Sequence, residues 1–507
     1  MKKLKIVILT LTFVTISVVG IVYATQVPSS NSISGDFQEG TFATKLFMDG
    51  LPFVPVTYFT NMDSDITKEE LLKSQLISYE ENIEILPEGI IAEIISEEDI
   101  YAELAAGKIA LLRPSQVSPK MKTLIVDGFY YWDYEEGYPL VSYQLKFTSD
   151  VEKEDEHHTF FAGGEIIPAR AVDRLGLNKY NNYTYLFDYY RDDIEDSDIA
   201  IALLENSIQG NPSPCTGCMS FLGDEQVAGG LSEVGFDFLS TAGNHAGDAG
   251  QSAYASTISL LNDKEIQTTG TGDTEDNVIS PTVMEVNGVR VGMISADDVA
   301  FYYWKKLSNE GVYGTNWFSI YNSGAYSIDE ERVQQINSIK EENEIDYLIV
   351  YMSWGVEYTN YPTNHQQNLA KAILDNGADI IIGSHPHWVQ SIEFYGDKPI
   401  IYSLGNFIFD QTHTTPTREG ATVKLHYLDQ ELKSIEIMPH LICGYHQNNN
   451  DLTPKLLGGE LSLDEIYDYP EANGCVFWQA KKLKPDHPSY REILERMFEY
   501  TSISEYE

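Results

Sequence analysis

Short apolar runs that stop abruptly at a polar residue recur along the middle of this chain and constrain its fold more than any other feature. The clearest run covers 380–382 and leads into His385 and His387, which can point to the same side of an extended segment. Four more runs have this form, namely 159–162 before Glu165, 199–204 before Glu205, 236–240 before Asn244 and His245, and 348–352 before Ser353. Helix-like stretches separate the runs, so we expect an α/β sheet whose strand ends gather these side chains.

The polar residues after these runs form a set of metal ligands. Imidazole together with carboxylate and amide oxygen suits Zn, Mn or Fe better than Ca or Mg alone. Each of these residues could instead have a purely structural role. His245 could lie in a glycine-rich turn, and His385 and His387 could pack beside Trp388. The carboxylates could cap helices or pair with Arg170. The predicted metal ligands are Glu165, Glu205, Asn244, His245, His385 and His387.

Six segments, read in order, resemble the CapA family of bacterial capsule and poly-γ-glutamate synthesis proteins. They are GEIIPAR (164–170), DIAIALLEN (198–206), AGNHAGDAG (242–250), WGVEY (354–358), GADIIIGSHPH (377–387) and IIYSLGNFIFD (400–410). The domain of that family is similar to the calcineurin-like metallophosphoesterases. The resemblance therefore implies a metallophosphoesterase-like β-sandwich flanked by helices, with a smaller N-terminal α/β domain before it.

Three positions depart from the family's pattern. Glu165 stands where the family usually has an aspartate, Leu203 stands at a usual asparagine, and Ser353 replaces the histidine of H-W-G. Glu165 can still bind metal, whereas a hydroxyl at 353 is a poor ligand. We expect one divalent metal ion (Mn, Zn or Fe), and the pattern leaves a second one open.

The ligand set would support metal-assisted hydrolysis, because a bound cation lowers the pKa of its water and polarises the oxygen under attack. His245 would donate a proton to the leaving group, and Asn244 would hold the metal or an oxyanion. Asp248 either caps a helix or orients His245, and Arg170 either anchors a substrate carboxylate or forms an ion pair. Weaker candidates after other strand-like runs are Asp297, Asp298 and Asp410.

Two functions agree with these features. The first is a surface metal-dependent hydrolase that acts on a phosphoester, or on an amide bond of an envelope polymer such as poly-γ-glutamate. The second is a non-catalytic scaffold that holds or guides an anionic polymer, either poly-γ-glutamate or a polysaccharide, alongside the machinery of synthesis and export. The substitutions at 165, 203 and 353 favour the scaffold more than an intact motif set would.

The charge balance restricts the partners. The chain has 33 Lys and Arg against 77 Asp and Glu, a formal charge of −44. Nucleic acid and anionic membrane surfaces are poor partners for such a surface, so we expect no nucleic acid, and contact with the membrane only through the N-terminal segment. The charge also argues against tight capture of a polyanion unless metal ions or a local basic patch intervene.

The first 25 residues predict export. Lys2, Lys3 and Lys5 precede an uncharged apolar stretch, 6–22, which is either a cleaved signal peptide or a single-pass membrane anchor. The body is expected outside the membrane in both cases, at the cell surface or secreted. Oxidising surroundings favour disulfides between Cys215 and Cys218 and between Cys443 and Cys475, although C-x-x-C also occurs in redox and zinc sites.

Composition and pattern divide the rest of the chain. Residues 26–50 form a polar tether, and 156–445 form the CapA-like domain. Residues 51–150 form an α/β domain, for which an interaction or spacer role is favoured over ligand binding. An acidic linker over 150–156 precedes His157 and His158, which are expected at the surface. Residues 446–507 form a C-terminal appendage with a helix over 490–500.

Overall fold

The computed structural model describes residues 46–133, 138–147, 157–175, 181–209, 219–301, 312–411, 414–428, 430–444 and 478–501. They belong to two compact units. The smaller unit comprises Met1–Leu51 and Tyr143–Glu152, and most of the pair formed by β1 (Leu46–Pro52) and β9 (Val141–Phe147) lies in it. The larger unit comprises Pro52–Ser142 and Lys153–Glu507.

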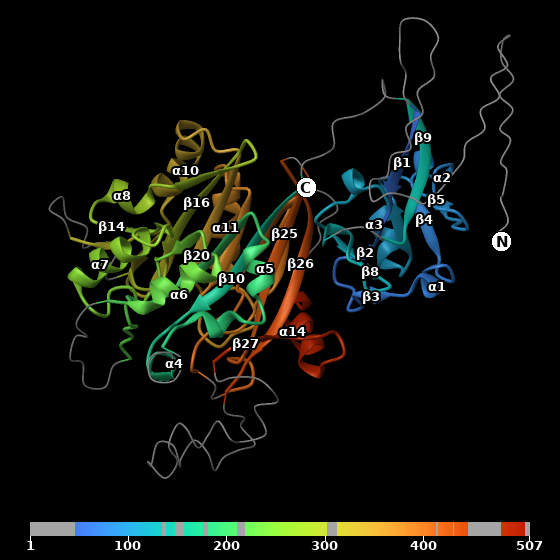
Figure 1. Cartoon of the computed structure of the whole chain (residues 1–507). Coiled ribbons are helices and arrows are strands. Elements are labelled where there is room, and N and C mark those ends of the chain that lie inside the picture. Colours follow the sequence, from blue (N-terminus) through green and yellow to red (C-terminus); the bar gives the residue numbers. More distant parts are fainter. Residues whose placement is uncertain are drawn as a thin grey trace, which may run out of the picture. The chain divides into compact units, whose positions relative to one another are not determined.

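Two sheets form the body of the larger unit (Figure 1). The 8-stranded sheet has the order β13 (Gln267–Thr269), β12 (Phe238–Ser240), β11 (Ile199–Leu204), β10 (His157–Ile166), β25 (Glu419–Leu428), β26 (Glu431–Ile442), β27 (Ala480–Lys482), and β24 (Asn406–Ile408) also pairs with β10. The 6-stranded sheet has the order β15 (Thr282–Val286), β16 (Val289–Asp297), β20 (Tyr347–Ser353), β21 (Ile380–Ser384), β23 (Lys398–Ile401), β22 (Ile392–Tyr395). Four neighbouring strands run parallel in each sheet. They are β10, β11, β12 and β13 in the 8-stranded sheet, and β16, β20, β21 and β23 in the 6-stranded sheet.

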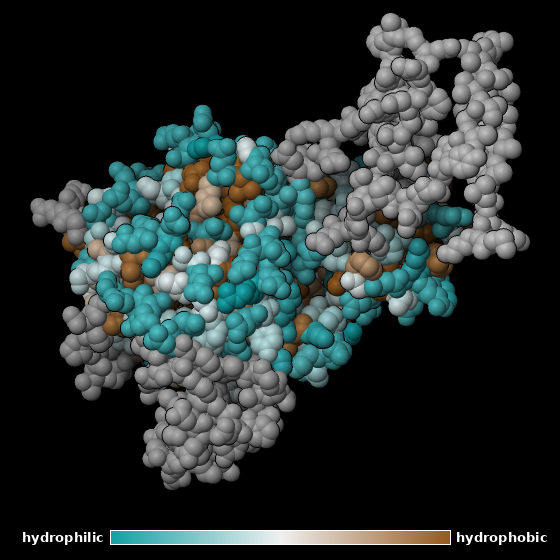
Figure 2. Space-filling view, in the orientation of Figure 1, coloured by the Kyte–Doolittle hydropathy of each residue, from teal (hydrophilic) through white to brown (hydrophobic). Residues whose placement is uncertain are grey.

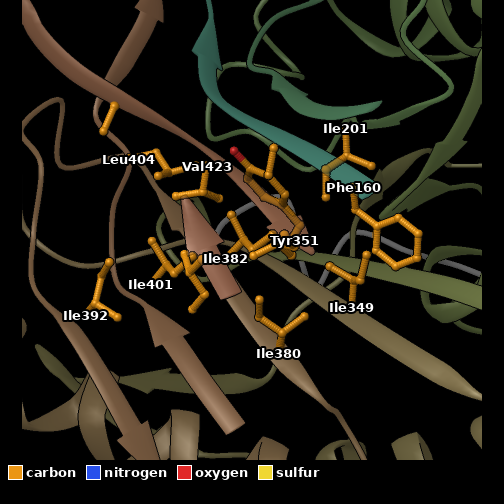
Figure 3. Packing of buried hydrophobic residues seen from close by; sticks show 14 of the residues in the cluster. Phe160, Ile201, Ile349, Tyr351, Ile380, Ile382, Ile392, Ile401, Leu404 and Val423 are labelled. Carbon is orange, nitrogen blue, oxygen red and sulfur yellow. The ribbon is translucent and has the colours of Figure 1, made fainter. Parts of the chain in front are cut away.

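Continuous apolar runs form these strands because both faces of each strand are buried. In β11, Ile201 and Leu203 belong to the core between the sheets, whereas Ala202 and Leu204 belong to the cluster on the outer face. β20 and β21 alternate in the same way on the other sheet, with Ile349, Tyr351, Ile380 and Ile382 facing inward, as Figure 3 shows. The side-chain period of two therefore assigns one half of every run to the sandwich core.

Helices cover both outer faces of the sandwich. α5 (Arg191–Glu195) and α6 (Gln226–Val234) pack on the 8-stranded sheet through Ile194 and Leu231. α10 (Glu330–Glu342) and α11 (Asn364–Asp375) pack on the 6-stranded sheet. Thr363 begins α11 with a capping box, since its side chain accepts from the Gln366 N–H and Gln366 reaches back to Thr363. The predicted β-sandwich flanked by helices is confirmed.

A small α/β assembly precedes the sandwich, also as expected. Its 5-stranded sheet has the order β5 (Glu93–Ile94), β4 (Leu76–Ser78), β6 (Ile109–Leu112), β2 (Val54–Tyr58), β7 (Met121–Thr123). α3 (Ile100–Ala105) covers it with Ile100 and Leu104, next to Trp132. Short elements complete this part, namely β3 (Asp65–Ile66) paired with β8 (Ile125–Val126), α1 (Lys68–Leu71) and α2 (Glu80–Ile83).

The remaining described elements are short, except for α7 and α14. They are α4 (Ala171–Leu175), α7 (Gln251–Asn262), α8 (Glu275–Ile279), the pair β14 (Thr271–Gly272) and β17 (Gly314–Thr315), the hairpin β18 (Ser319–Asn322) and β19 (Ala325–Ile328), and α14 (Pro488–Phe498). The helix expected over 490–500 is thus present and begins two residues earlier.

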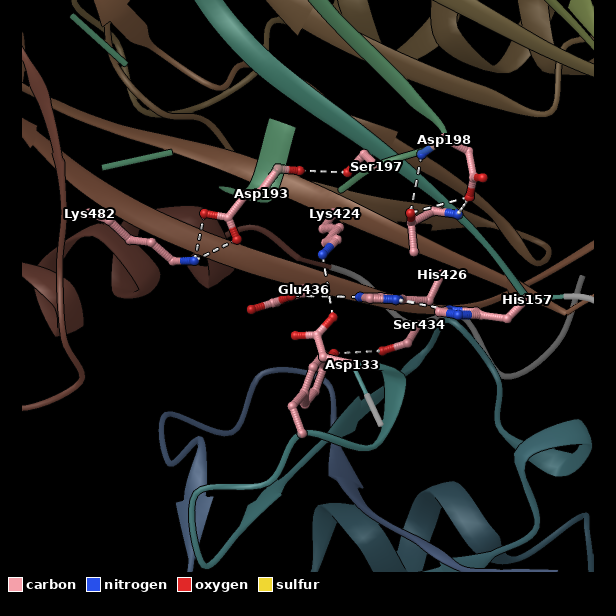
Figure 4. Close-up of polar contacts among 12 residues, drawn as sticks. Asp133, His157, Asp193, Ser197, Asp198, Lys424, His426, Ser434, Glu436 and Lys482 are labelled. Atoms are coloured by element: carbon pink, nitrogen blue, oxygen red, sulfur yellow. Dashed lines mark hydrogen bonds and ion pairs between the residues drawn. The ribbon is translucent and has the colours of Figure 1, made fainter. Parts of the chain in front are cut away.

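Polar contacts tie the small α/β assembly to β25 within the larger unit (Figure 4). Lys424 Nζ lies 3.3 Å from Asp133 Oδ1. His157 Nε2 and His426 Nδ1 are 3.3 Å apart, and their rings stack at 5.5 Å with Trp132 5.7 Å from His426. The predicted surface position of His158 is wrong, because the pairing of β10 with β25 leaves its side chain only 2 % exposed.

Several predictions concern residues outside the described ones. These include the apolar stretch 6–22, the linker 150–156 and three of the cysteines, Cys215, Cys218 and Cys475. Cys443 is described and is not a free thiol, and both disulfide pairings stay predictions. None of the helices in the described ranges is long and apolar enough to cross a membrane. Figure 2 shows a face of the molecule on which hydrophilic residues predominate, in line with the acidic composition.

Candidate active site

The predicted strand ends do meet, but they come from two sheets. Glu165 lies near the end of β10, Glu205 follows β11 and Asn244 follows β12, all in the 8-stranded sheet. Ser353 ends β20 and His385 follows β21 in the 6-stranded sheet. The apolar runs predicted the strands correctly, whereas the expectation that the strand ends meet at the edge of a single sheet was wrong. The site lies where the ends of the two sheets come together.

A bulge in β10 aims Glu165 into the site. The register between β10 and β11 shifts between Ala162 and Glu165. Gly164 in this bulge must remain a glycine, because an added Cβ would meet the Gly405 carbonyl oxygen at 2.1 Å. The Glu165 N–H donates to the same carbonyl over 3.1 Å, which fixes the position from which the side chain projects.

Glu165 connects the two histidines of the 6-stranded sheet. Its Oε2 lies 2.7 Å from His387 Nδ1, and its Oε1 accepts the backbone N–H of His385. His387 Nδ1 also lies 2.9 Å from Asn406 Oδ1. Burial alone would raise the pKa of Glu165, but the charges and hydrogen bonds of His387 and His385 lower it overall. Burial would lower the pKa of His387, and the Glu165 carboxylate raises it overall, so the two form a buried ion pair.

His385 and Asn244 make the second short contact of the site. His385 Nδ1 lies 3.0 Å from Asn244 Oδ1. Burial, with the neighbouring His387, lowers the pKa of His385 to about 3, so this imidazole is neutral. Both His385 (φ 95°) and His387 (φ 59°) have left-handed backbone conformations. Such conformations are costly for residues with a Cβ, and they occur where surrounding structure holds a functional loop in place.

Glu205 is a buried carboxyl without a compensating cation. Its side chain is 1 % exposed, and its Oε2 has no hydrogen-bond partner. Burial, followed by the charges of Glu165, Asp297 and Asp248, raises its pKa well above the usual value. Gly243 passes so close that an added Cβ would meet Glu205 Oε2 at 2.7 Å. A buried acceptor oxygen beside other carboxylates is a place where a cation would be stabilised.

His245 and Arg170 are the more accessible residues of the site. His245 Nδ1 lies 2.8 Å from Asp248 Oδ2, and the same oxygen accepts the Phe221 N–H over 2.8 Å. Asp248 therefore orients His245, one of the two roles considered for it. The Arg170 guanidinium lies 4.9 Å from the ring centre of Phe221 and pairs with Asp410 through two nitrogens.

The two other departures from the family pattern occupy buried positions. Leu203 is fully buried in the core between the sheets and does not reach the site. Ser353 is also buried, and its Oγ donates to Asp297 Oδ1 over 3.4 Å, because Asp297 and Ser353 are register partners on β16 and β20. Asp298 is buried beside them, and its burial raises its pKa to about 6. A hydroxyl and a carboxylate thus stand where an imidazole was expected.

The residues of this site fit a divalent metal by their chemistry. Glu205 offers a buried oxygen without a donor, and the contacts Glu165–His387 and Asn244–His385 each bring an oxygen and an imidazole nitrogen within 3.0 Å. No three of the described His, Cys, Asp or Glu side chains are placed together so that they could hold a metal ion. Glu165 contacts His387 directly over 2.7 Å.

Three side chains of the site were not singled out from the sequence. Asn406 contacts His387, Tyr358 stacks on His387 with ring centres 5.8 Å apart, and Phe221 lies 4.4 Å from the His245 ring. Asn406 and Tyr358 belong to the segments YSLGNFIFD and WGVEY, so the motif blocks could have indicated them. Phe221 lies outside every motif, and only the fold brings it to His245.

Residues 159–411, half of the chain, match the family model described as bacterial capsule synthesis protein PGA_cap. The capsule biosynthesis protein CapA of Bacillus anthracis is 28% identical over 355 residues, which cover 68% of this chain and 81% of that protein. The PGA biosynthesis protein CapA of Bacillus subtilis (strain 168) is 28% identical over 318 residues, 61% of this chain and 79% of that protein. Among solved structures, a putative 5'-nucleotidase from Staphylococcus aureus matches with a TM-score of 0.36 and 14% identity, covering 62% of this chain and 57% of that one.

Proposed function

The chain belongs to the PGA_cap family of bacterial capsule synthesis proteins, also called the CapA family, and we propose that it is a metal-dependent hydrolase of an envelope polymer. The bond attacked is a phosphoester or the amide bond of a polymer such as poly-γ-glutamate. The protein works outside the membrane, held by its N-terminal segment or secreted, beside the machinery that makes and exports the polymer. The names of the two Bacillus relatives, which refer to capsule and PGA biosynthesis, support this setting.

One observation carries the proposal. Glu165, Asn244, His385 and His387 come from both sheets of the sandwich and meet through contacts of 2.7 Å and 3.0 Å, with the unpaired buried oxygen of Glu205 beside them. A fold stabilised only by packing has no need for buried carboxylates and imidazoles, because burying such groups costs free energy. Convergent buried polar groups of this kind are typical of a site that binds a charged ligand.

The metal would be held by Glu165, Glu205, Asn244, His385 and His387, with His245 nearby. When bound, a divalent cation supplies a nucleophile near neutral pH and polarises the oxygen under attack. His245 presents its Nε2 because Nδ1 is held by Asp248, and it is the proton donor to the leaving group. Asn406 holds the plane of the His387 ring by its contact with Nδ1.

Arg170 is the substrate-binding cation at this site. Its side chain is 40% exposed although Asp410 pairs with it, and the rings of Phe221 and Phe409 lie 4.9 Å from it. The Asp410 pair and the two rings hold the guanidinium in one orientation, from which the remaining N–H groups can donate to a carboxylate or phosphate. On a chain with a net charge of −44, such a local cation is what an anionic polymer requires.

A second candidate function is a non-catalytic scaffold that holds or guides the polymer. The direct Glu165–His387 ion pair favours it, since this pair is satisfied without a metal. The Ser353–Asp297 contact at the position of the missing imidazole favours it as well. Both candidates place the protein in polymer synthesis and differ only in whether this site performs chemistry.

Ser353→His separates the two candidates. If the site is a hydrolase weakened by the loss of one ligand, the variant binds more metal and cleaves a generic phosphodiester faster, and about 1.4 kcal/mol of added transition-state stabilisation gives a tenfold gain. The matched control is Ser353→His combined with His245→Gln, which should lose the gain. A folded variant that binds one more metal ion and hydrolyses nothing above background counts for the scaffold.

A further inference from the structure

Tyr358 lies directly on one of the site's imidazoles. Its ring stacks on His387 with centres 5.8 Å apart and an interplanar angle of 28°. Its N–H donates to the Pro386 carbonyl over 2.9 Å, and its hydroxyl accepts from Gln411 Nε2 over 2.8 Å. Tyr358 adopts a left-handed conformation (φ 61°), so its surroundings must hold the backbone there.

The segment that carries Tyr358, residues 355–361, is anchored from the inside by one buried side chain. Gln390 is fully buried, and its Nε2 donates to the Thr359 carbonyl over 3.0 Å and to the Tyr361 carbonyl over 3.1 Å. These bonds hold residues that follow Tyr358, but no contact from Gln390 reaches its ring or the outer side of the segment.

The C-terminal helix α14 holds the same segment from the outside. Asn360 Nδ2 donates to Glu499 Oε2 over 2.6 Å, and the rings of Tyr361 and Tyr500 lie 6.1 Å apart. Both partners on this side follow directly after the last residue of α14, Phe498. The C-terminal residues and the site are therefore joined through a single short segment.

α14 is itself firmly attached to the sandwich. Its apolar face places Ile493, Leu494 and Met497 in the core between the sheets, each at most 1 % exposed. Arg496, at the edge of this face, pairs with the fully buried Glu419 at the start of β25. A helix held by its buried face and by a buried ion pair beside it is a rigid support, which is what a positioning residue requires.

We propose that α14 positions Tyr358 on His387, so that the C-terminal part of the chain sets the orientation of this imidazole. Tyr358 is then a positioning residue of the metal site, and this part of the inference rests on the proposed function. The coupling runs from Glu499 through Asn360 to the segment 355–361 and the Tyr358 ring. An imidazole held in one plane binds metal more tightly than one that is free to rotate, because less ordering remains to be done on binding.

Amide hydrogen exchange on the metal-free full chain tests whether α14 holds the segment 355–361. Glu499→Ala removes the acceptor of Asn360, and exchange across 355–361 should rise about threefold to tenfold, the scale of one lost hydrogen bond. Glu499→Gln keeps an acceptor oxygen and should restore slow exchange. Glu495→Ala on the same acidic face of α14 is the matched control. Unchanged exchange in Glu499→Ala, or an equal rise in Glu495→Ala, overturns the coupling.

Calorimetric titration with Mn²⁺ tests whether Tyr358 positions His387 for metal binding. Tyr358→Leu should weaken Mn²⁺ binding about tenfold, as loss of a residue that orients a ligand does, whereas Tyr358→Phe retains the ring and should bind almost as the wild type does. Equal affinities in the Leu and wild-type proteins overturn the role of Tyr358. If the wild type binds no Mn²⁺, the metal site of the proposed function and the role of Tyr358 in it fail together, while the exchange measurement still decides whether α14 holds the segment.

Discussion

Two pairs of neighbouring histidines among the described residues, His385 with His387 and His157 with His426, differ in their electrostatics, because only the first pair contains an imidazole whose pKa is raised. At the strand ends, Glu165 raises the pKa of His387 overall in spite of its burial. Between β10 and β25, burial lowers the pKa of His426 to about 3, and burial followed by the charge of His426 lowers that of His157 to about 4. The close contact with Glu165 at 2.7 Å raises the pKa of His387, whereas Glu436, 3.6 Å from His426, does not prevent burial from lowering the pKa of His426.

The largest expected effect comes from removing the partner of the buried carboxylate. His387→Ala leaves Glu165 buried without its counter-charge and should lower the free energy of unfolding by about 3–5 kcal/mol. Urea unfolding at pH 7 measures this. Glu165→Gln combined with His387→Ala removes both charges and should recover part of the loss. If the double variant is no more stable than the single one, Glu165 is not held by an ion pair.

The neutral pair should make the protein sensitive to acid. His426 has a folded-state pKa of about 3, below its unfolded value, so below about pH 6.5 the unfolded chain binds a proton that the folded chain does not. Stability should therefore fall as the pH decreases, by about 1.4 kcal/mol per pH unit for this one residue. Urea unfolding at pH 7 and pH 5 should show a smaller loss in His426→Leu than in the wild type. Equal losses in the two proteins would refute this origin.

The smallest effect is expected at the rim of the neutral pair. Asp133 is half exposed and lies 3.3 Å from Lys424, so Asp133→Asn should cost less than about 1 kcal/mol, as exposed ion pairs generally do. Thermal unfolding at low and high salt measures it. A much larger cost would mean that Asp133 also holds the stacked histidines in place. The charge of Asp133 would then have to be included when the two histidine pairs are compared.

The same comparison shows how far the sequence predicts such sites. His385 and His387 follow an apolar run within a specific motif, so their strand, their position at its end and their role as candidate ligands were all predictable. His157 and His426 are 269 residues apart and meet only because β10 pairs with β25. Pairing between distant strands leaves no local signal, which is why a surface position was wrongly expected for His158, whereas His157 is exposed as expected.

Within the site, too, contacts between distant parts of the chain limit what the sequence can predict. The runs predicted each strand, but the division into two sheets came from the resemblance to a known family, since a buried run does not say which sheet it joins. The reach of Glu165 to His387 depends on the bulge at Gly164, and the pairing of Arg170 with Asp410 spans 240 residues. The conformations of the site thus depend on tertiary contacts that the motif residues do not encode.

Metal uptake tests the central claim most directly. The purified chain, stripped with chelator and reloaded with Mn, Zn or Fe, should retain at least one equivalent by elemental mass spectrometry and melt at a higher temperature. His385→Ala should lose this uptake, whereas His157→Ala, in the other histidine pair, should keep it. Retention of metal by His385→Ala, or a wild-type protein that takes up none of the three metals and melts unchanged in their presence, would contradict the account.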